Sequence, residues 1–438
     1  MRMGTRFFWC ALVVLISKEV FPQPATDTLT ISYPKAEAVF IRRNLQLLAG
    51  KLGIDEANAR VLQAKLWPNP TLSIGEVNLW SNGTPEELGR ITGRWGNHTQ
   101  MAVEVEQLIQ TAAKRKKLMA VEEAGVLVAE KQFEDLLRSL KTEFRLRLSE
   151  LERTQQRTVI YQQAHSQLLL LLQAYRKQFE QGNVSKSEYV RLRALEASLV
   201  SDIVDIGKQN QAAQQALKVL MGVAPHTELI LVGGVPEEVP LAAFKTLTPA
   251  TLLEWAQANS TALQTAQLEK IKAEHQLSYE KAHRVPDLTV QVNYDRGGNI
   301  MRDFIGVGVS MDIPFFQRNQ GNIRAAQATV DRSQLLAENK RNEVDGAVVQ
   351  AWKALLLSIE QKEKLGADLG AELDTLQQAY QQRFAQRDIS LLEYLDYLDA
   401  YLDAKDHILD NQVDIYTQIE TLRYYIGDQL PLTTKTDD

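Results

Sequence analysis

The fold is decided by a stretch that occurs twice: FEQGNVSKSEY at Phe179–Tyr189 and FAQRDISLLEY at Phe384–Tyr394. Phe, Gln, Ser, Glu and Tyr are identical, at a constant offset of 205 residues. Further pairs in the same order are Asn44 with Asn259, Pro68 with Pro286, and Gly222 with Gly427. Because repeats of this kind reveal an architecture before single elements do, the chain is interpreted as an internal duplication.

Each half shows the same order of elements: a helical stretch, two short strands, a very long helix and a second helix. Prolines end the first stretch, and Gly182-Asn183 breaks the long helix of the first half. The elements expected in the first half are 34–66, 71–80, 100–107, 113–179 and 185–221. Those expected in the second half are 249–285, 287–295, 304–313, 322–384 and 390–426.

The N-terminus is typical of a secretory signal. Arg2 and Arg6 precede a run of ten apolar residues, Phe7–Ile16, too short for a bilayer span of about 20 residues. A buried N-terminal helix is the alternative. The predicted division is therefore a signal peptide (1–25), a first repeat (26–222), a linker (223–248), a second repeat (249–427) and a C-terminal tail (428–438).

Composition excludes several functional classes. The 49 Lys and Arg against 55 Asp and Glu give a net charge of −6, which argues against a nucleic-acid partner. A single cysteine, Cys10, forms neither an internal disulfide nor a cysteine metal site, and the six histidines lack metal-ligand spacing. With no nucleophile elbow, phosphate-binding loop or dinucleotide fingerprint, we expect no enzyme, no cofactor and no bound metal.

The strand candidates alternate between apolar and polar residues, and the apolar set includes Val103, Val105, Val290, Val292, Val307 and Val309. This pattern has two interpretations. One is a sheet packed on a core with its other face in water. The other is a membrane barrel with strands of about 9–11 residues, these valines facing lipid and the opposite residues lining a wet lumen. Four strands are too few to close a barrel, so an oligomer would have to close it; a trimer supplies twelve.

The long helices carry apolar residues at coiled-coil spacing, such as Phe133, Leu137, Leu140 and Phe144, and Val344, Val348 and Ala351. This spacing predicts packed antiparallel helices. A helix over 113–179 would be about 100 Å long, a length that suits a span of the periplasm. A soluble periplasmic helical scaffold is the alternative, but it leaves the four symmetrically placed strands without a role.

Taken together, the duplication, the signal segment, Asn69-Pro70-Thr71-Leu72 and the two F-x-Q-x-[ND]-[VI]-S-x-x-E-Y stretches resemble the TolC family of outer-membrane efflux channels. The length and the Trp67–Pro70 stretch look most like its heavy-metal-efflux branch, of the CzcC and CusC kind. The resemblance implies a mainly α fold with a membrane β-barrel part: a homotrimer with a 12-stranded barrel and an α-helical periplasmic tunnel.

The same resemblance implies a passive exit duct in the bacterial outer membrane, in contact with outer-membrane lipid. Substrates would arrive from an inner-membrane RND-type pump through a periplasmic adaptor. Heavy-metal cations are the expected substrates; drugs or other small molecules, or secreted proteins, are the alternative for the same family.

Candidate functional residues lie at the two helix–helix turns. Within the family, acidic residues at the places of Glu393 and Asp396 form a ring at the closed periplasmic end, which attracts cations. Arg387 and Asp388 could make closing contacts in the turn. Gly182, Asn183, Ser185 and Ser390 are the candidates for adaptor contact. The alternative is that these are ordinary turns and helix starts. A basic run, Lys114–Lys117, is interpreted either as lying near anionic headgroups or as a solvated face.

Overall fold

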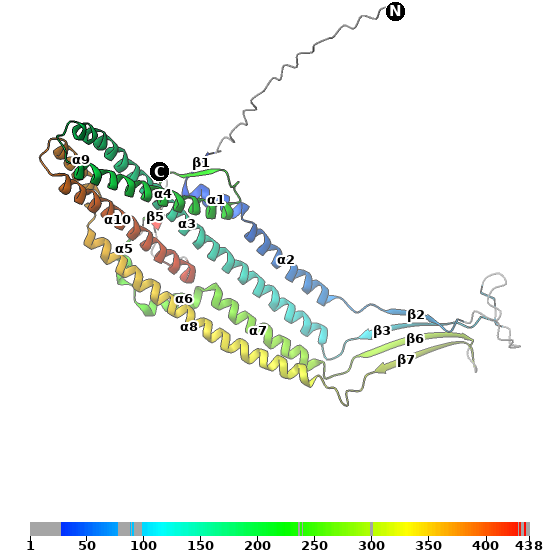
Figure 1. Ribbon diagram of the computed structural model, residues 1–438. Helices are drawn as coiled ribbons and strands as arrows, with labels where there is room; N and C mark the ends of the chain where they lie inside the picture. Colours follow the sequence, from blue (N-terminus) through cyan, green and yellow to red (C-terminus); the bar gives the residue numbers. More distant parts are fainter. Residues whose placement is uncertain are drawn as a thin grey trace, which may run out of the picture.

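The protein is elongated in the computed structural model, with a bundle of long helices at one end and a narrow sheet at the other (Figure 1). The structure describes residues 28–77, 88, 90, 91, 99–234, 237, 238, 240–297, 301–427, 429, 430, 433 and 434. The predicted signal peptide and most of the C-terminal tail lie outside the described residues, as does the end of the first predicted strand, up to Trp80.

The described chain follows the order expected from the duplication. The first repeat contains α1 (Tyr33–Arg43), α2 (Leu45–Lys65), β2 (Thr71–Gly75), β3 (Ala102–Ile109), α3 (Lys114–Glu180) and α4 (Lys186–Met221). The second contains α6 (Pro249–Asn259), α7 (Thr261–Ala282), β6 (Leu288–Gly297), β7 (Arg302–Met311), α8 (Gln320–Leu365), α9 (Leu369–Ala385) and α10 (Leu391–Ile426). Short elements complete the fold: β1 (Thr28–Ile31), β4 (Glu228–Leu231), β5 (Glu237–Glu238), α5 (Leu241–Thr246) and β8 (Thr433–Thr434).

The first helical stretch of each repeat is divided, where the sequence predicts one helix. The Asn44 side chain accepts a hydrogen bond from the Leu47 amide and so caps α2, and its amide group donates to the Leu220 carbonyl oxygen at 2.9 Å. In the second repeat Ser260 caps α7 in the same way. Asn44 is therefore equivalent to Ser260, one position beyond the Asn259 that the sequence alignment pairs with it. A buried side-chain cap starts a new helix at each position.

The long helix of the second repeat is also interrupted, although the sequence predicts one helix over 322–384. The first-repeat counterpart, α3, runs unbroken for 67 residues. In the second repeat α8 ends at Leu365, and Gly366 follows with a φ of 81°, a conformation that glycine adopts without steric cost. Helix α9 begins at Leu369, so the part of the expected helix nearest the tip is a separate helix.

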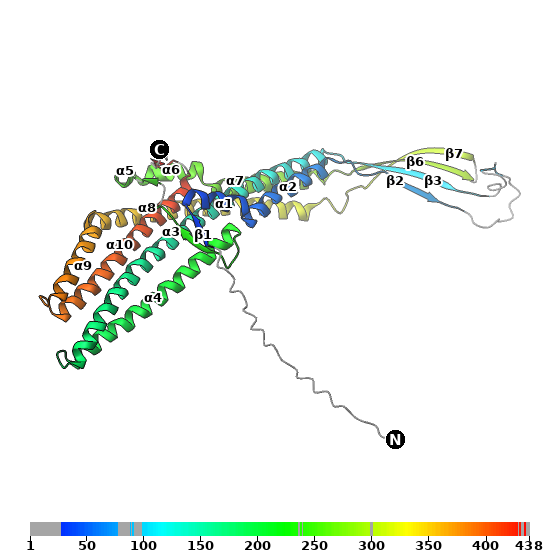
Figure 2. The ribbon, with the colours of Figure 1, turned by 90° about the horizontal axis from the view of Figure 1, so that it is seen from above.

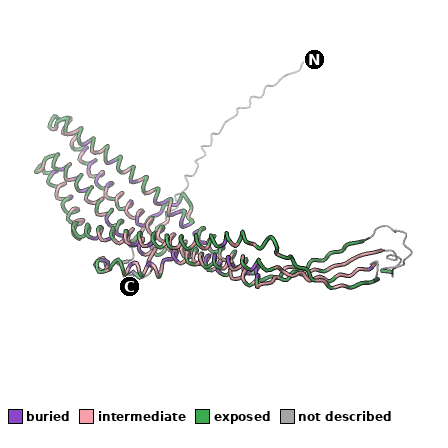
Figure 3. The backbone as a smooth tube through the Cα atoms, turned by 90° about the horizontal axis from the view of Figure 1, so that it is seen from below, coloured by how far each residue is buried: buried purple, intermediate pink, exposed green. Residues whose placement is uncertain are grey.

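Strands β2, β3, β6 and β7 form one antiparallel sheet in the order β2-β3-β6-β7. Strands β3 and β6, from different repeats, pair in the middle, so the sheet joins the two repeats. The edge strands β2 and β7 are exposed along most of their length, and the central strands are partly buried (Figure 3).

Three apolar clusters hold the helices together. One lies between α1, α3 and α4, and another between α6, α8 and α10. The third joins the lower parts of α3 and α4 to those of α9 and α10, including Leu168, Leu192 and Leu398. As a result the hairpins α3–α4 and α9–α10 lie side by side at the end of the molecule remote from the sheet (Figure 2).

Candidate functional site

The two helical tips are built from the duplicated motif in the same way. Ser390 is the N-cap of α10: its side chain accepts from the Glu393 amide, and the Glu393 carboxylate accepts from the Ser390 amide at 2.8 Å. Ser185 and Glu188 form the same reciprocal pair at the start of α4. The Ser-x-x-Glu of the repeat is therefore a capping box in both copies.

The turns before these caps share a backbone geometry. Gly182 and Arg387 occupy equivalent positions with φ values of 77° and 65°. In each turn two backbone amides bond back to the last helical turn, which satisfies carbonyl groups that the helix end leaves open. Glycine adopts this conformation freely, whereas a side chain such as that of Arg387 makes it costly.

The aromatic residues of the motif bridge each hairpin. Phe179 stacks on Tyr189, with ring centroids 5.3 Å apart, and Phe384 stacks on Tyr394 at 4.9 Å. Tyr175 of α3 also stacks on Phe384 at 5.8 Å, so an aromatic contact connects the two hairpins. Four of the five identical residues of the motif thus have a structural role: Ser and Glu cap the second helix of each hairpin, and Phe and Tyr hold its two helices together.

The gate candidates lie at the α9–α10 tip. Arg387 and Asp388 are exposed in the turn, and Asp396 is exposed one helical turn beyond Glu393. The Glu393 carboxylate is bound to its own helix start rather than to Asp396. The hydrogen bond from the Ser390 amide, helped by the Ser390 side chain, lowers the pKa of Glu393.

A groove of about 980 Å³ separates the two tips. It brings together candidates from both turns, since Asn183, Arg387 and Ser390 line it along with Glu188. The other two tip candidates, Gly182 and Ser185, belong to the same α3–α4 turn and are exposed. The groove combines amide, hydroxyl and charged groups with leucine and aromatic side chains.

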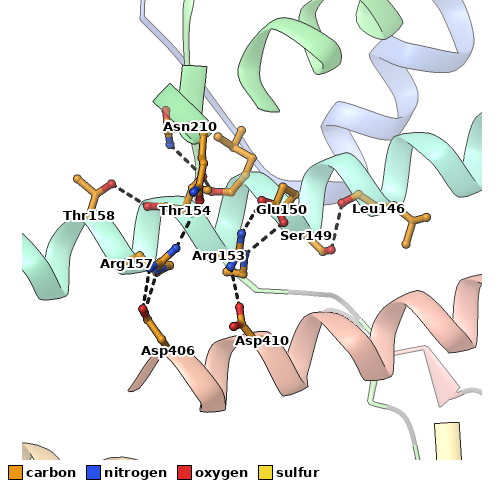
Figure 4. Close-up of polar contacts among 12 residues, drawn as sticks. Leu146, Ser149, Glu150, Arg153, Thr154, Arg157, Thr158, Asn210, Asp406 and Asp410 are labelled. Carbon is orange, nitrogen blue, oxygen red and sulfur yellow. Dashed lines mark hydrogen bonds and ion pairs between the residues drawn. The ribbon is translucent and has the colours of Figure 1, made fainter. Parts of the chain in front are cut away.

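A second polar site, between α3 and α10, was not found by the sequence analysis (Figure 4). Arg157 of α3 donates to both carboxylate oxygens of Asp406, at 2.8 and 2.6 Å, and the Tyr161 hydroxyl donates to the same carboxylate at 2.9 Å. Burial first, and then the bond to Asp406, raises the pKa of Tyr161 to about 12. One helical turn from Asp406 toward the sheet, an ion pair joins Arg153 to Asp410 at 2.6 Å.

The same arrangement continues toward the sheet. Arg145 of α3 binds Glu420 of α10, which is 1% exposed, and also Glu37 of α1. We call Arg145, Arg153 and Arg157 the arginine column. Each member binds a carboxylate on the antiparallel α10. In the sequence, the three arginines are spaced so that they share one face of a helix, and the acidic residues of α10 have a matching spacing. This spacing does not reveal which helices are neighbours.

In the sheet, the register places the six valines on one face. Val105 lies opposite Val292, which lies opposite Val307, and Val290 lies opposite Val309. Val103 lies between Ile74 and Tyr294 on the same face. The other face carries the polar residues, and there the side chains of Asn293 and Gln291 lie directly over Gly306 and Gly308.

Two kinds of feature are absent from the described residues. No cluster of three or more His, Cys, Asp or Glu side chains in these ranges is placed to hold a metal ion. Nor does any helix in the described parts of the chain combine the length and the hydropathy of a membrane span.

Known proteins resemble this chain in sequence and in fold. The family model of outer membrane efflux proteins matches residues 252–428. The chain is 23% identical over 383 residues to the cobalt-zinc-cadmium resistance protein CzcC of Cupriavidus metallidurans, covering 87% of this chain and 85% of that protein.

Solved structures share the fold. The outer membrane channel CmeC of Campylobacter jejuni matches with a TM-score of 0.73 at 14% identity, over 92% of this chain and 87% of that one. CusC matches with a TM-score of 0.64 at 17% identity, over 91% and 93%. The family model and the similarity to CzcC bear out the recognition of a TolC-family outer membrane efflux protein, and the solved structures share its fold.

Proposed function

We propose that three copies of this chain form a passive exit duct, with a 12-stranded barrel and a helical tunnel. The observation that carries the proposal is the open, two-faced sheet. Its apolar face is unusually exposed for a single chain, with Val307 at 74%, and β2 and β7 stand at its two ends. Pairing β7 of one copy with β2 of the next would join the sheets into a barrel with valines toward lipid and amides toward the lumen.

The helical part would then continue the duct across the periplasm. Substrates would be delivered by an inner-membrane RND-type pump through a periplasmic adaptor, and the groove between the two tips is the surface that we assign to adaptor contact. Asn183 and Ser390 line it, and Gly182 and Ser185 shape one of the turns beside it.

We assign the closed end of the tunnel to the α9–α10 tip. Asp396, with Glu393, would supply the acidic ring, and Arg387 and Asp388 would supply contacts that break on opening. Since the Glu393 carboxylate is engaged in the capping box, Asp396 carries more of the proposed selectivity than the sequence implies.

Heavy-metal cations are the proposed substrates, on the similarity to a protein named for cobalt, zinc and cadmium resistance. Small-molecule drugs or secreted proteins remain the alternative substrates for a duct of the same architecture. The alternative of a soluble periplasmic scaffold is disfavoured by the exposed apolar face of the sheet.

Deletion of the gene tests substrate and function together. The deletion strain is expected to lose tolerance to cobalt, zinc and cadmium salts and to regain it from a plasmid copy, while tolerance to a drug panel is unchanged. Lost drug tolerance with unchanged metal tolerance would reject the metal proposal. Recovery of the full-length protein as a detergent-free monomer would reject the duct.

A further inference from the structure

The junction between helices and strands combines exposed aromatic residues with a local excess of positive charge. The connections that join α2, α3, α7 and α8 to the strands β2, β3, β6 and β7 lie at one level along the molecule (Figure 1). We call the residues of this level, 65–70, 111–117, 280–287 and 312–324, the collar. They contain nine Lys and Arg but only three Asp and Glu, in a chain whose net charge is −6.

The collar's few carboxylates are partly engaged within the protein. Asp287 accepts from the buried Lys114 at 2.7 Å, and Glu280 accepts from Asn319 at 2.7 Å. Lys65, Lys116, Lys281, Arg284, Arg318 and Arg324 are all exposed. The collar is therefore a surface of positive potential on an acidic protein, and a negatively charged partner fits it.

Aromatic side chains at the two edges of the sheet are held outward. Trp67, which precedes β2, is 58% exposed, and the Arg115 guanidinium lies 4.0 Å from its ring centroid. Beyond β7, Phe316 is 91% exposed and contacts Phe315 edge to face. The loop that carries these phenylalanines is fastened by hydrogen bonds from Arg318 to the Pro314 carbonyl and from Gln320 to the Phe316 carbonyl.

The apolar face of the sheet leads directly into this collar. Val307, Val309 and Met311 lie on the apolar face of β7, Ile313 and Phe315 follow the strand, and all five are exposed. Large apolar surface that ends in aromatic residues and cations is the pattern of a membrane–water interface, where rings lie at headgroup level and Lys and Arg contact phosphate.

We propose that the collar binds anionic phospholipid headgroups, with Arg115, Lys65 and Lys116 as the principal contacts. The inference rests on the proposed function, because the proposed duct places the apolar face of the sheet in the outer membrane. It adds the class of lipid that the protein binds at the periplasmic boundary of that membrane. Arg115, stacked on Trp67, presents its guanidinium to a phosphate while the indole lies against the acyl–headgroup boundary.

The test uses native mass spectrometry of the full-length mature protein in detergent, titrated with dioleoyl phosphatidylglycerol or with the zwitterionic dioleoyl phosphatidylcholine. The wild type is expected to bind phosphatidylglycerol at least tenfold more tightly than phosphatidylcholine. The collar variant carries Lys65→Gln, Arg115→Gln and Lys116→Gln and so lacks three cations. Each cation near an anionic surface contributes about a factor of five to the affinity, so the affinity for phosphatidylglycerol should fall tenfold or more.

A matched control removes the same charges from the far end of the molecule and should bind phosphatidylglycerol like the wild type. It consists of Lys177→Gln, Lys186→Gln and Arg193→Gln, all exposed near the α3–α4 tip. Equal binding of the two lipids by the wild type, or equal loss in the control, would overturn the proposal.

A third variant separates lipid from a second copy as the partner. Trp67→Ala with Phe316→Ala should weaken phosphatidylglycerol binding and leave the oligomeric mass unchanged. If it instead dissociates the oligomer at every lipid concentration, the aromatic residues are covered by a neighbouring copy and the lipid proposal fails. A wild-type protein that is monomeric and needs no detergent would show that the proposed duct itself is wrong. This outcome is distinct from both weakened lipid binding and dissociation of the oligomer.

Discussion

Arg157 of α3 holds both carboxylate oxygens of Asp406 of α10, 249 residues away along the chain and contributed by the other repeat. With Arg153–Asp410 and Arg145–Glu420 it forms a line of charge pairs along two antiparallel helices. These pairs connect the repeats within the helical part, as β3 and β6 connect them within the sheet. The charge pairs therefore hold α10, which leads to the proposed gate, against α3 from Asp406 to Glu420.

The Arg157–Asp406 pair should contribute measurably to stability. Both side chains are mostly buried, so Asp406→Asn leaves the guanidinium without its charge partner. We expect a loss of about 1.5–3 kcal/mol in the free energy of unfolding, measured by guanidinium titration in detergent. Asp205→Asn, which removes the exposed partner of Lys208, is the control and should cost under about 1 kcal/mol. Equal costs would show that the buried pair contributes no more to stability than an exposed one.

The hydrogen bond from Tyr33 to Glu152, 2.5 Å long, predicts a pH dependence. Burial raises the pKa of Glu152, and the Tyr33 hydroxyl opposes this by stabilising the carboxylate. A carboxyl with a raised folded pKa binds its proton more tightly in the folded state, so it favours folding at low pH and this contribution is lost as pH rises through the folded pKa. Tyr33→Phe removes the opposing donor and so raises the pKa of Glu152 further.

We therefore expect Tyr33→Phe to cost about 1 kcal/mol at pH 7.5 and less at pH 5. Unfolding free energies of wild type and variant at the two pH values give the comparison. In a Glu152→Gln background the cost of Tyr33→Phe should no longer depend on pH, which makes a double-mutant cycle the control. A cost that is larger at pH 5 would contradict the assignment.

The two tip turns predict opposite effects of exchanging glycine for a side chain. Arg387 has a φ of 65° where its counterpart is Gly182. Arg387→Gly should stabilise the folded protein or leave it unchanged, because the left-handed conformation costs about 1 kcal/mol for a residue with a Cβ. Gly182→Ala should destabilise by about 1 kcal/mol for the same reason. Thermal unfolding in detergent measures both, and a stabilising Gly182→Ala would refute the argument.

The acidic tip can be tested apart from its capping role. Glu393→Gln keeps an acceptor for the Ser390 amide, since glutamine also serves in a capping box. Combined with Asp396→Asn, it should lower the preference of the channel for cations in planar-bilayer recordings. Glu188→Gln removes the equivalent charge from the other tip and should leave the preference nearly unchanged. Unaltered selectivity in the double variant would remove both residues from the proposed gate.

The sequence predicted those features that depend on local chemistry. Alternation over residues 287–295 and 304–313 identified both strands of the second repeat, and the Phe179–Tyr189 motif identified both tips. It did not predict the arginine column, because charge spacing on α3 does not determine that α10 packs beside it. The break at Gly366 was missed because one glycine inside a strong helical pattern is often tolerated; the break depends on the backbone conformation adopted there.

Two adjacent residues of β7 give the sharpest test of the sheet. Val309 lies on the apolar face opposite Val290, and Ser310 lies on the polar face opposite Thr289. In the proposed barrel, Val309→Arg would place a charge against hydrocarbon at a cost of up to about 2–4 kcal/mol, whereas Ser310→Arg would point into water. We expect Val309→Arg to reduce the heat-modifiable oligomer in the outer-membrane fraction and Ser310→Arg to assemble normally. Equal assembly would mean that neither face meets lipid; the reverse order would mean that the sheet is closed with its valines inward.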